Sequence, residues 1–255
     1  MTISVITICL NSERYIAQTI ESVISQTYAE KEYIMVDGGS TDGTLDIIRK
    51  YEDRIDCLIS EPDHGIADAM NKGLDLSSGD FVIFLHSDDY FVDSNVLDKA
   101  AGHLSNDAEI FLFDIFFEKN GKKVLKTPRG FNWWLNIKNG VFHQSTICSR
   151  ALFDKIGFFD TSYKIAMDYD FFLRAYRKGV CTKKIHIPLS VMRLVGISSQ
   201  TDRNSLRARF SEEKRVHEKN CQNRVAKIFY SMFWTCYPFY RFLKDSVSKG
   251  SKGQQ

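Results

Sequence analysis

Two adjacent carboxylates, Asp88 and Asp89, follow a run of five apolar residues at 81–85. Such a run is too short for an isolated helix, and its residue types favour a strand buried on both faces. Because ligands of open α/β sheets bind beyond the carboxyl ends of the strands, the pair stands where a ligand is expected. Neighbouring carboxylates repel each other unless solvent, a proton or a cation intervenes. The pattern therefore favours either a cation site or an ordinary polar turn in which Ser87 or Asp88 caps the next element.

The elements that would position these acids alternate between buried strands and amphipathic helices. Residues 3–10 and 33–36 have the apolar character of parallel strands, and between them a polar segment at 11–13 predicts the cap of a helix. The glycine-containing segment 38–44 predicts a tight turn near a ligand, followed by a capped helix that runs to residue 51. This alternation predicts an α/β fold of right-handed βαβ units, with a mostly parallel central sheet and helices on both faces.

The pattern changes in the second half of the chain. Asn120 and Gly121 are a strong hairpin signal after an apolar strand, which indicates local antiparallel pairing. A helix opens at Asp168 and ends before Gly179. A later strand at 185–195 contains Pro188, which predicts a place at the edge of the sheet. We therefore expect residues 91–200 to have a different task from residues 1–90.

Composition sets the broad class of the protein. The 255 residues are 44% hydrophobic and 26% charged, with a net charge of +2, which is typical of a globular protein and argues against a nucleic-acid partner. The six cysteines are widely spaced and form no C-x-x-C pair, which argues against a zinc site and favours free thiols in a reducing compartment. The first ten residues indicate a strand, not a signal peptide, and no uncharged stretch is long enough to span a bilayer.

Five motifs occur in the first 199 residues. They are 4–11 (SVITICLN), 36–44 (VDGGSTDGT), 60–73 (SEPDHGIADAMNKG), 84–89 (FLHSDD) and 168–174 (DYDFFLR). Each is weak alone, but all of them in this order are specific. The chain resembles the family 2 glycosyltransferases of the GT-A fold, the nucleotide-diphospho-sugar transferase fold, and in particular bacterial enzymes that build O-antigen, capsule or exopolysaccharide. The resemblance covers about residues 3–199.

The resemblance implies inverting transfer of a hexose or N-acetylhexosamine from a UDP-sugar to an acceptor hydroxyl. Residues 1–90 would bind the nucleotide-sugar and residues 91–200 the acceptor. In the nucleotide half, Asp37 corresponds to the acid that hydrogen-bonds uracil, and Glu13 corresponds to the acid near the base and ribose. Ser87, between the strand and the acid pair, is a further nucleotide-binding candidate.

The resemblance also assigns the chemical step. Asp88 corresponds to the second acid of the D-x-D motif, which holds Mn²⁺ or Mg²⁺ against the diphosphate, and Asp89 is either a second ligand or a residue that orients the loop. Asp168 corresponds to the general base that removes the proton of the acceptor hydroxyl. A carboxylate in the first turn of a helix is stabilised by the helix dipole, which keeps it ionised and ready to accept.

Three positions depart from the family pattern. His86 stands in place of the first acid of D-x-D, which puts the ribose contact of that acid in doubt. Gly38 stands where many members have a second acid, and Met167 replaces the glutamate that often precedes the base. The metal site survives these changes, because one or two carboxylates with substrate phosphates suffice for Mg²⁺.

Several acids have an ordinary structural alternative. Asp168 could serve only as a helix cap, and Asp170, two residues later, is a rival base or a residue of the acceptor pocket. Asp63 and Asp68 could line the donor-sugar pocket. Asp68 with Lys72 is equally an i,i+4 surface pair.

Candidate acceptor contacts lie in a loop-rich stretch. His143 and Gln144 could touch the acceptor, although a lone loop histidine is commonly a surface residue. Trp133 and Trp134 could stack on a sugar ring or pack into the core.

Two other functions compete with the transferase. A catalytically weak nucleotide-sugar-binding protein is suggested by His86 and Met167. A nucleotidyltransferase also uses metal-binding acids on an α/β sheet, but it would need a glycine-rich phosphate loop with a basic residue after the first strand. Residues 10–13 (LNSE) do not provide such a loop.

The C-terminal region differs from the rest in composition. Residues 201–243 are helical in pattern, basic at first and then aromatic, and the segment from 244 to 255 is predicted to be a disordered tail. Aromatic residues with basic flanks suit a membrane interface, although a helix packed on the catalytic domain is the alternative. With the family context, this predicts a cytoplasmic enzyme, peripheral on the anionic inner face of the membrane, with a polyprenyl-diphosphate-linked oligosaccharide as acceptor.

Overall fold

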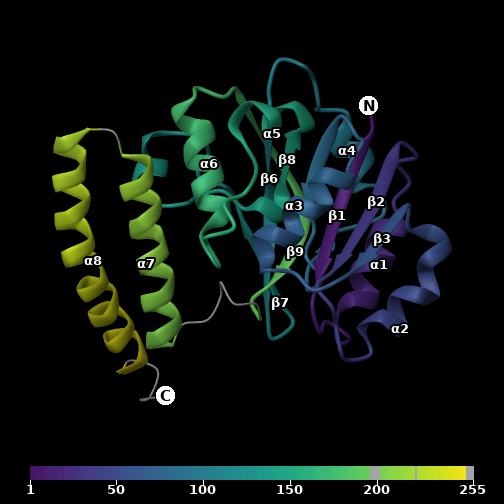
Figure 1. Ribbon diagram of the computed structural model, residues 1–255, viewed down its shortest axis with the longest axis horizontal. Helices are drawn as coiled ribbons and strands as arrows, with labels where there is room; N and C mark the ends of the chain where they lie inside the picture. Colours follow the sequence, from purple (N-terminus) through teal and green to yellow (C-terminus); the bar gives the residue numbers. More distant parts are fainter. Residues whose placement is uncertain (196–201, 222, 251–255) are drawn as a thin grey trace. The chain divides into compact units, whose positions relative to one another are not determined.

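The first strand, β1 (Ile3–Cys9), lies inside a group of four parallel strands. It pairs with β2 (Lys31–Asp37) on one side and β4 (Phe81–Phe84) on the other, and β3 (Cys57–Ser60) extends the group beyond β2. The strands are parallel, so their carboxyl ends meet at one edge of the sheet. The computed structural model describes residues 1–195, 202–221 and 223–250, in two compact units that divide after Ser199 (Figure 1).

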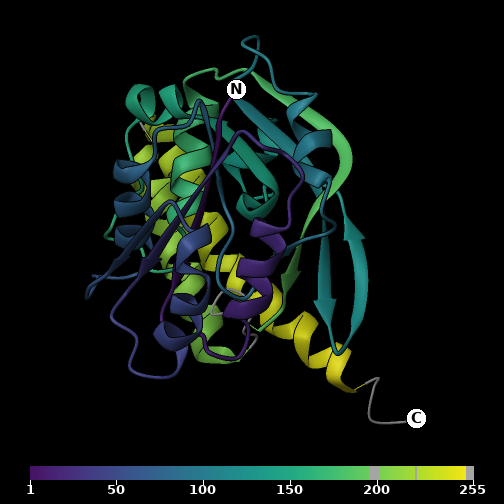
Figure 2. The same ribbon diagram turned by 90° about the vertical axis from the view of Figure 1, so that its right-hand side faces the viewer.

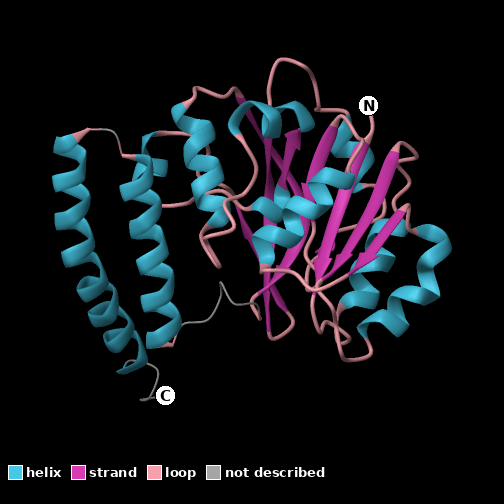
Figure 3. Cartoon of the chain, viewed as in Figure 1, coloured by secondary structure: helices cyan, strands magenta, loops and turns pink. Residues whose placement is uncertain are grey.

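Side-chain alternation on β1 explains why helices cover both faces of this sheet. Val5 packs in one cluster with Ile16 and Ile20 of helix α1 (Ile16–Ile24). The next residue, Ile6, faces the opposite helix α3 (Ile66–Leu76), where a β-carbon on Gly73 would overlap its side chain. Helix α3 therefore approaches the sheet closely because position 73 carries no side chain. The predicted layering with helices on both faces is confirmed (Figure 3).

The second half of the sheet is mixed. Strand β8 (Thr146–Ser149) runs antiparallel to β4, β6 (Ile110–Lys119) runs antiparallel to β8, and β9 (Thr182–Arg193) then pairs parallel to β6 (Figure 2). The full order is β3-β2-β1-β4-β8-β6-β9-β5, with β7 paired to β6. Among the described strands four pairings are parallel and four antiparallel, so the sheet is wholly parallel only in its first half.

Two turn signals in this half have different outcomes. The predicted hairpin is confirmed: Asn120 and Gly121 have φ values of 51° and 73° between β6 and β7 (Lys122–Lys126). Pro188 does not mark the edge of the sheet, because the short strand β5 (Tyr90–Phe91) pairs beyond β9. The proline is accommodated instead where the register between β6 and β9 shifts, near Asp114.

The predicted helix boundaries are only partly right. The polar segment at 11–13 does not cap a helix directly, since α1 begins at Ile16 and Tyr15 makes no side-chain cap bond. The helix expected to reach residue 51 is α2 (Thr44–Ile48) followed by a 3₁₀ helix. The remaining elements of this unit are η1 (Arg49–Arg54), α4 (Val96–Ala101), η2 (Trp133–Asn136), η3 (His143–Ser145), α5 (Arg150–Ile156) and α6 (Met167–Arg177).

The second unit is a pair of helices, α7 (Arg203–Asn220) and α8 (Arg224–Gly250). Helix α7 begins at Asp202, whose side chain accepts hydrogen bonds from two backbone N–H groups. We expected a disordered tail from residue 244, but α8 continues to Gly250, and residues 251–255 lie outside the described part of the chain. Among the described residues, no helix combines the length and the apolar character that crossing a bilayer requires.

The apolar residues of α8 divide between a packed face and an exposed face. Trp234 donates a 2.8 Å hydrogen bond from Nε1 to Nδ1 of His217 on α7, and Tyr230 stacks on the same imidazole. These aromatics form the small core of the second unit. The other face carries exposed apolar side chains, among them Val225, Ile228 and Met232.

Candidate active site

Three loops meet at the carboxyl edge of the parallel strands. The backbone N–H of Asn11, after β1, donates to Ser40 Oγ after β2 at 2.8 Å. The hydroxyl groups of Ser12 and Ser87 are 2.8 Å apart, which joins the loop after β1 to the loop after β4. Thr19 on α1 donates from Oγ1 to the carbonyl oxygen of Ser87 at 2.8 Å. The predicted residue Ser87 is therefore part of the connection that holds this edge together.

Asp37 ends β2 as a fully buried carboxylate. Its Oδ2 accepts hydrogen bonds from the backbone N–H groups of Gly39 (3.1 Å) and Ser40 (3.0 Å) and from Ser60 Oγ (2.8 Å). Its Oδ1 accepts from Ser40 Oγ. Burial alone would raise the pKa of Asp37, but these hydrogen bonds from Ser40, Ser60 and Gly39 outweigh it and hold the pKa below its ordinary value. The carboxylate shapes the turn that follows it.

Glu13, like Asp37, accepts a hydrogen bond from the backbone of the segment that follows β2. Its Oε2 accepts a 2.9 Å hydrogen bond from the backbone N–H of Gly43, just before α2 begins. The backbone N–H of Glu13 in turn lies 3.3 Å from Asp42 Oδ2. Glu13 thus joins the loop after β1 to the start of α2, on the side of the sheet edge where Asp37 lies.

Asp63 and Asp68, expected in the donor pocket, have separate positions. Asp68 Oδ2 accepts from the backbone N–H of His64 at 3.0 Å and lies 3.8 Å from Lys72 Nζ, so the ordinary i,i+4 pair is present. Asp63 instead points back to the turn after β2, where its carboxylate lies against Gly38. Of the two, only Asp63 reaches the edge formed by β1 and β2.

The two carboxylates of the acid pair have opposite environments. Asp89 is 1% exposed, and its Oδ1 accepts a hydrogen bond from the backbone N–H of Arg193 at 3.1 Å. Burial and then the charge of Asp88 raise the pKa of Asp89 well above its ordinary value. Of the two roles predicted for Asp89, this contact favours the one in which it orients the loop.

Asp88 has no side-chain hydrogen bond from another residue in the part of the chain that the structure describes. Burial raises its pKa, and its own backbone N–H, Arg193 and His143 oppose this rise. The same described residues contain no cluster of three or more His, Cys, Asp or Glu side chains arranged around a metal. Asp88 therefore fits the part of a single carboxylate ligand, with diphosphate oxygens and water completing the shell of Mg²⁺ or Mn²⁺.

Arg193 organises the acid loop, and it was missed in the sequence. Its guanidinium lies between the rings of Tyr15 (4.7 Å) and Tyr90 (4.5 Å), and Nη1 donates to the carbonyl oxygen of Asp88 at 2.6 Å. Nη2 donates to Gln18, and Nε lies 3.5 Å from Glu118. The signal that could have revealed it is an arginine directly after the mostly apolar stretch 187–192, because a charged residue beside buried neighbours must find partners inside the fold.

Asp168 lies in the first turn of α6 and meets His143 of η3. Its Oδ2 accepts from Asn139 Nδ2 at 3.0 Å and lies 3.4 Å from His143 Nδ1, and its Oδ1 accepts from the backbone N–H of Tyr169 at 2.7 Å. The helix cap is Ala166, so Asp168 is not the cap residue itself. Its side chain is 19% exposed, which leaves it accessible to a ligand.

His86 connects this base candidate to the acid loop. The rings of His86 and His143 are 4.6 Å apart, and neither Nε2 has a hydrogen-bond partner among the described residues. Burial, and then the neighbouring His143, lower the pKa of His86 well below its ordinary value, so its imidazole is neutral at neutral pH. The structure therefore brings His86, Asp88, His143 and Asp168 into one cluster.

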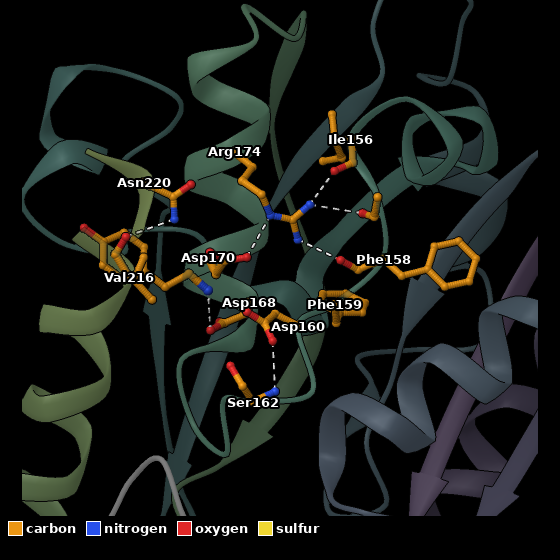
Figure 4. Close-up of polar contacts among 12 residues, drawn as sticks. Ile156, Phe158, Phe159, Asp160, Ser162, Asp168, Asp170, Arg174, Val216 and Asn220 are labelled. Atoms are coloured by element: carbon orange, nitrogen blue, oxygen red, sulfur yellow. Dashed lines mark hydrogen bonds and ion pairs between the residues drawn. The ribbon is translucent and has the colours of Figure 1, made fainter. Parts of the chain in front are cut away.

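The rival base Asp170 is placed elsewhere. It is fully buried, and its Oδ2 accepts a 2.7 Å hydrogen bond from Nε of Arg174 (Figure 4). Arg174 also donates to the carbonyl oxygens of Ile156 (2.5 Å) and Phe158 (2.7 Å), which fixes the loop after α5. Asp170 therefore orients Arg174, and its expected place in the acceptor pocket is corrected.

The tryptophans expected either to stack on a sugar or to pack in the core are largely exposed. Trp133 and Trp134 are 59% and 56% exposed and contact each other edge to face. Neither ring is part of the core, so the alternative that they pack into the core is wrong. Both remain available for an acceptor.

A family model matches the described architecture over residues 4–181, under the description "Glycosyl transferase family 2". The chain belongs to glycosyl transferase family 2. The match covers the acid loop and α6, so it includes Asp88 and Asp168. Family membership excludes the nucleotidyltransferase alternative.

Two curated relatives are similar over most of their length. A PGL/p-HBAD biosynthesis glycosyltransferase of Mycobacterium bovis is 28% identical over 78% of this chain and 79% of its own. The Escherichia coli enzyme WfaP, a UDP-Glc:alpha-D-GlcNAc-diphosphoundecaprenol beta-1,3-glucosyltransferase, is 30% identical over 72% of this chain and 74% of its own. Both are named as transferases of sugars.

Two solved structures share the fold. Staphylococcus aureus TarS 1–349 in complex with UDP-GlcNAc has a TM-score of 0.68 at 21% identity, over 90% of this chain and 69% of its own. A mannosyltransferase from Pyrobaculum calidifontis in complex with GDP-Man and Mn²⁺ has a TM-score of 0.67 at 15% identity, over 98% of this chain and 74% of its own. At these identities the likeness shows the fold, and the predicted GT-A fold is confirmed.

Proposed function

We propose that this glycosyltransferase transfers a hexose or N-acetylhexosamine from a UDP-sugar, with inversion, to a saccharide linked to a polyprenyl diphosphate. The observation that carries the proposal is the cluster that joins Asp88 and Asp168, far apart in sequence, through the rings of His86 and His143, which are 4.6 Å apart and tilted. Two carboxylates with different partners in one cluster can divide two tasks, holding the leaving group and accepting a proton.

Asp168 is proposed as the base for the acceptor hydroxyl. Asn139 and His143 hold its Oδ2, and the backbone of Tyr169 holds its Oδ1, so the carboxylate is oriented before an acceptor arrives. Removal of the hydroxyl proton lets the oxygen attack the anomeric carbon from the face opposite the diphosphate, which inverts the configuration. General base catalysis of this kind contributes about 10²–10⁴-fold.

Asp88 is proposed as the protein ligand of Mn²⁺ or Mg²⁺. A bound divalent cation stabilises the negative charge that develops on the departing diphosphate. Arg193 holds the backbone of Asp88 in place and Asp89 is tied to the backbone of Arg193, so the loop geometry does not depend on the cation. The relative named for a UDP-Glc donor supports the choice of a UDP-sugar here.

The experiment that tests the function measures UDP release. Purified protein is mixed with Mn²⁺, a panel of UDP-hexoses and UDP-N-acetylhexosamines, and a polyprenyl-diphosphate-linked sugar. We expect one donor to release UDP only when the acceptor is present, with a product of inverted anomeric configuration by NMR. Tight UDP binding with no release from any donor would favour the catalytically weak binding protein instead.

The proposal extends to the place where the enzyme works, the anionic inner face of the membrane, in the synthesis of a surface polysaccharide such as O-antigen. The support is the exposed face of α8, where Ile228 and Met232 are 64% and 67% exposed beside the basic residues Arg224 and Lys227. Apolar side chains flanked by cations suit the headgroup region of an anionic bilayer. A lipid-linked acceptor would be reached at the same surface.

Vesicle sedimentation tests this location. We expect the full chain to sediment with vesicles that contain phosphatidylglycerol and the double variant Ile228→Glu/Met232→Glu to remain in the supernatant. Vesicles of phosphatidylcholine alone are the control for the charge contribution. Equal sedimentation of the variant would remove α8 as the membrane contact.

A further inference from the structure

Asp63 and Gly38 come from separate loops and share one position at the sheet edge. A β-carbon built on Gly38 would overlap Oδ2 of Asp63 and would lie 3.0 Å from its carboxyl carbon. Gly38 does not have a positive φ, so the backbone itself does not require glycine there. Glycine at this position leaves the space that the Asp63 carboxylate occupies. The loop after β3 thus places an acid where a side chain at position 38 would otherwise stand.

The carboxylate of Asp63 is held on one side and free on the other. Its Oδ1 accepts a 2.8 Å hydrogen bond from the backbone N–H of Gly65. Among the residues that the structure describes, Oδ2 has no hydrogen-bond donor, and no cation lies within ion-pair distance of Asp63. The nearby Lys72 is engaged instead by Glu61 at 2.7 Å and by the carbonyl oxygen of Pro62 at 3.1 Å. Asp63 therefore keeps a negatively charged acceptor atom unused.

Asp37, the neighbouring acid, has hydrogen-bond donors on both of its carboxylate oxygens. Five donors from Cys9, Gly39, Ser40 and Ser60 already reach its two oxygens, and the residue is fully buried. A ligand that needed Asp37 as an acceptor would have to displace bonds that shape the turn. A ligand that needed Asp63 would displace none. At this edge, Asp63 is the acid that is ready to accept a hydrogen bond.

We infer that Asp63, not Asp37, reads the nucleobase of the donor by accepting the imino N–H of uracil through Oδ2. The inference rests on the proposed function, because it assumes that a nucleoside diphosphate binds at this edge. A carboxylate only accepts, and uracil presents an N–H at N3 where cytosine presents a lone pair. Asp63 is thus a specificity-determining residue that favours a uridine nucleotide and repels a cytidine nucleotide.

Calorimetric titration of the full chain with UDP and with CDP, both with Mg²⁺, tests the assignment. We expect the wild type to bind UDP more tightly than CDP by at least about tenfold, since a hydrogen bond to a charged group is lost with CDP. Asp63→Asn should weaken UDP about tenfold and leave CDP unchanged or tighter, because an amide can also donate to N3 of cytosine. The matched control is Glu61→Gln, an exposed neighbour that should leave the UDP/CDP ratio unchanged.

A second pair of variants transfers the carboxylate from position 63 to position 38. Asp63→Ala should lose the preference for UDP, and Gly38→Asp/Asp63→Ala should recover part of it, since position 38 then has room for a carboxylate. Native-like circular dichroism of each variant separates loss of binding from loss of the fold. A folded double variant that is as indiscriminate as Asp63→Ala would overturn the inference.

Other outcomes separate the inference from the proposed function. Equal loss of UDP and CDP affinity in Asp63→Asn would place Asp63 at the ribose or diphosphate and overturn the base-reading role. Unchanged UDP affinity in Asp63→Asn would also overturn it. A wild type that binds GDP in preference to UDP would contradict the UDP donor alone, because guanine also has an imino N–H, and the GDP/ADP ratio would then test Asp63. A wild type that binds none of these nucleotides would overturn both.

Discussion

Asp37 ends β2 and Asp88 follows β4, so both lie at the carboxyl edge of the parallel strands. Their carboxylates have opposite hydrogen-bonding environments. Five donors reach Asp37, whereas no side chain or backbone group of another described residue donates to the carboxylate of Asp88. The pKa of Asp37 is lowered by its hydrogen bonds despite burial, and the pKa of Asp88 is raised by burial. The carboxylate of Asp37 is engaged by groups of the protein, and that of Asp88 is the one we propose as the metal ligand.

The same division separates Asp168 from Asp170 on α6. Two residues apart on a helix, they cannot share a face. Asp170 faces inward and pairs with Arg174, and Asp168 remains partly exposed beside His143. We propose that Asp37 and Asp170 serve the structure and that Asp88 and Asp168 carry the chemistry.

The largest expected effect is on turnover in Asp168→Asn. Asparagine keeps the shape and the contact with Asn139 or Tyr169, but it cannot accept a proton at neutral pH. We expect kcat to fall by about 10²–10⁴-fold with UDP affinity nearly unchanged. Steady-state kinetics with a separate UDP titration measure the two quantities.

Asp170→Asn is the matched control for this change. It leaves Arg174 without its ion pair inside the fold, so we expect a lower melting temperature but a kcat of the folded protein near that of the wild type. A larger kcat loss in Asp170→Asn than in Asp168→Asn would return the role of base to Asp170.

Asp88→Ala should lose at least about 10²-fold in kcat, because the developing charge on the diphosphate is no longer stabilised through the cation. EDTA should inhibit the wild type to a similar extent, and Mn²⁺ should restore the wild type but not the variant. Binding of Mn²⁺ in the presence of UDP, followed by electron paramagnetic resonance, gives a measurement that is independent of turnover. Full activity of the wild type in EDTA would contradict the metal role.

Asp37→Asn should act on stability. An amide nitrogen facing the N–H groups of Gly39 and Ser40 cannot accept from them, so we expect a loss of about 1.5–3 kcal/mol in the free energy of unfolding. The folded-state pKa of Asp37 is lowered, so its contribution is fully present above the ordinary carboxyl pKa and is lost as the pH falls through the folded value.

In urea unfolding, the difference in free energy of unfolding between wild type and Asp37→Asn should therefore be the same at pH 7 and at pH 5. It should shrink only below about pH 3.9, the ordinary value for an aspartate. Asp46→Asn is the control, because Asp46 forms an exposed pair with Arg49 and should change stability by less than about 1 kcal/mol. A difference that grew on acidification would contradict the sign of the pKa shift.

The sequence was most informative where a short-range pattern determines the outcome. Alternation of strands and helices, the hairpin at Asn120, and the acids at strand ends follow from local periodicity and turn chemistry, and these were predicted. The family motifs gave Asp88 and Asp168 as candidates. Which of Asp168 and Asp170 faces inward could not be predicted, because the helical period separates them without saying which side meets the core.

Long-range partners were beyond local patterns. Arg193 is 105 residues from the carbonyl group of Asp88 that it contacts, and no spacing rule connects them. The same holds for the backbone N–H of Arg193 and the carboxylate of Asp89, and for Asp63 and the space beside Gly38. These contacts depend on how the β6–β9 region and the loop after β3 return to the sheet edge, which only the folded chain defines.

The smallest expected effect is that of His86→Asp, which restores the acid that the family pattern has at this position. His86 Nε2 has no hydrogen-bond partner among the described residues, so the substitution breaks no polar contact and loses chiefly the ring packing on His143. A new carboxylate near Asp88 raises the affinity of the loop for a cation while repelling its neighbour, and these effects oppose each other. We expect kcat/KM to stay within about tenfold of wild type, roughly 1.4 kcal/mol. A loss of a hundredfold or more in kcat/KM, with the fold intact by circular dichroism, would show that the imidazole itself contacts the substrate. His86 would then act in the reaction together with Asp88 and Asp168.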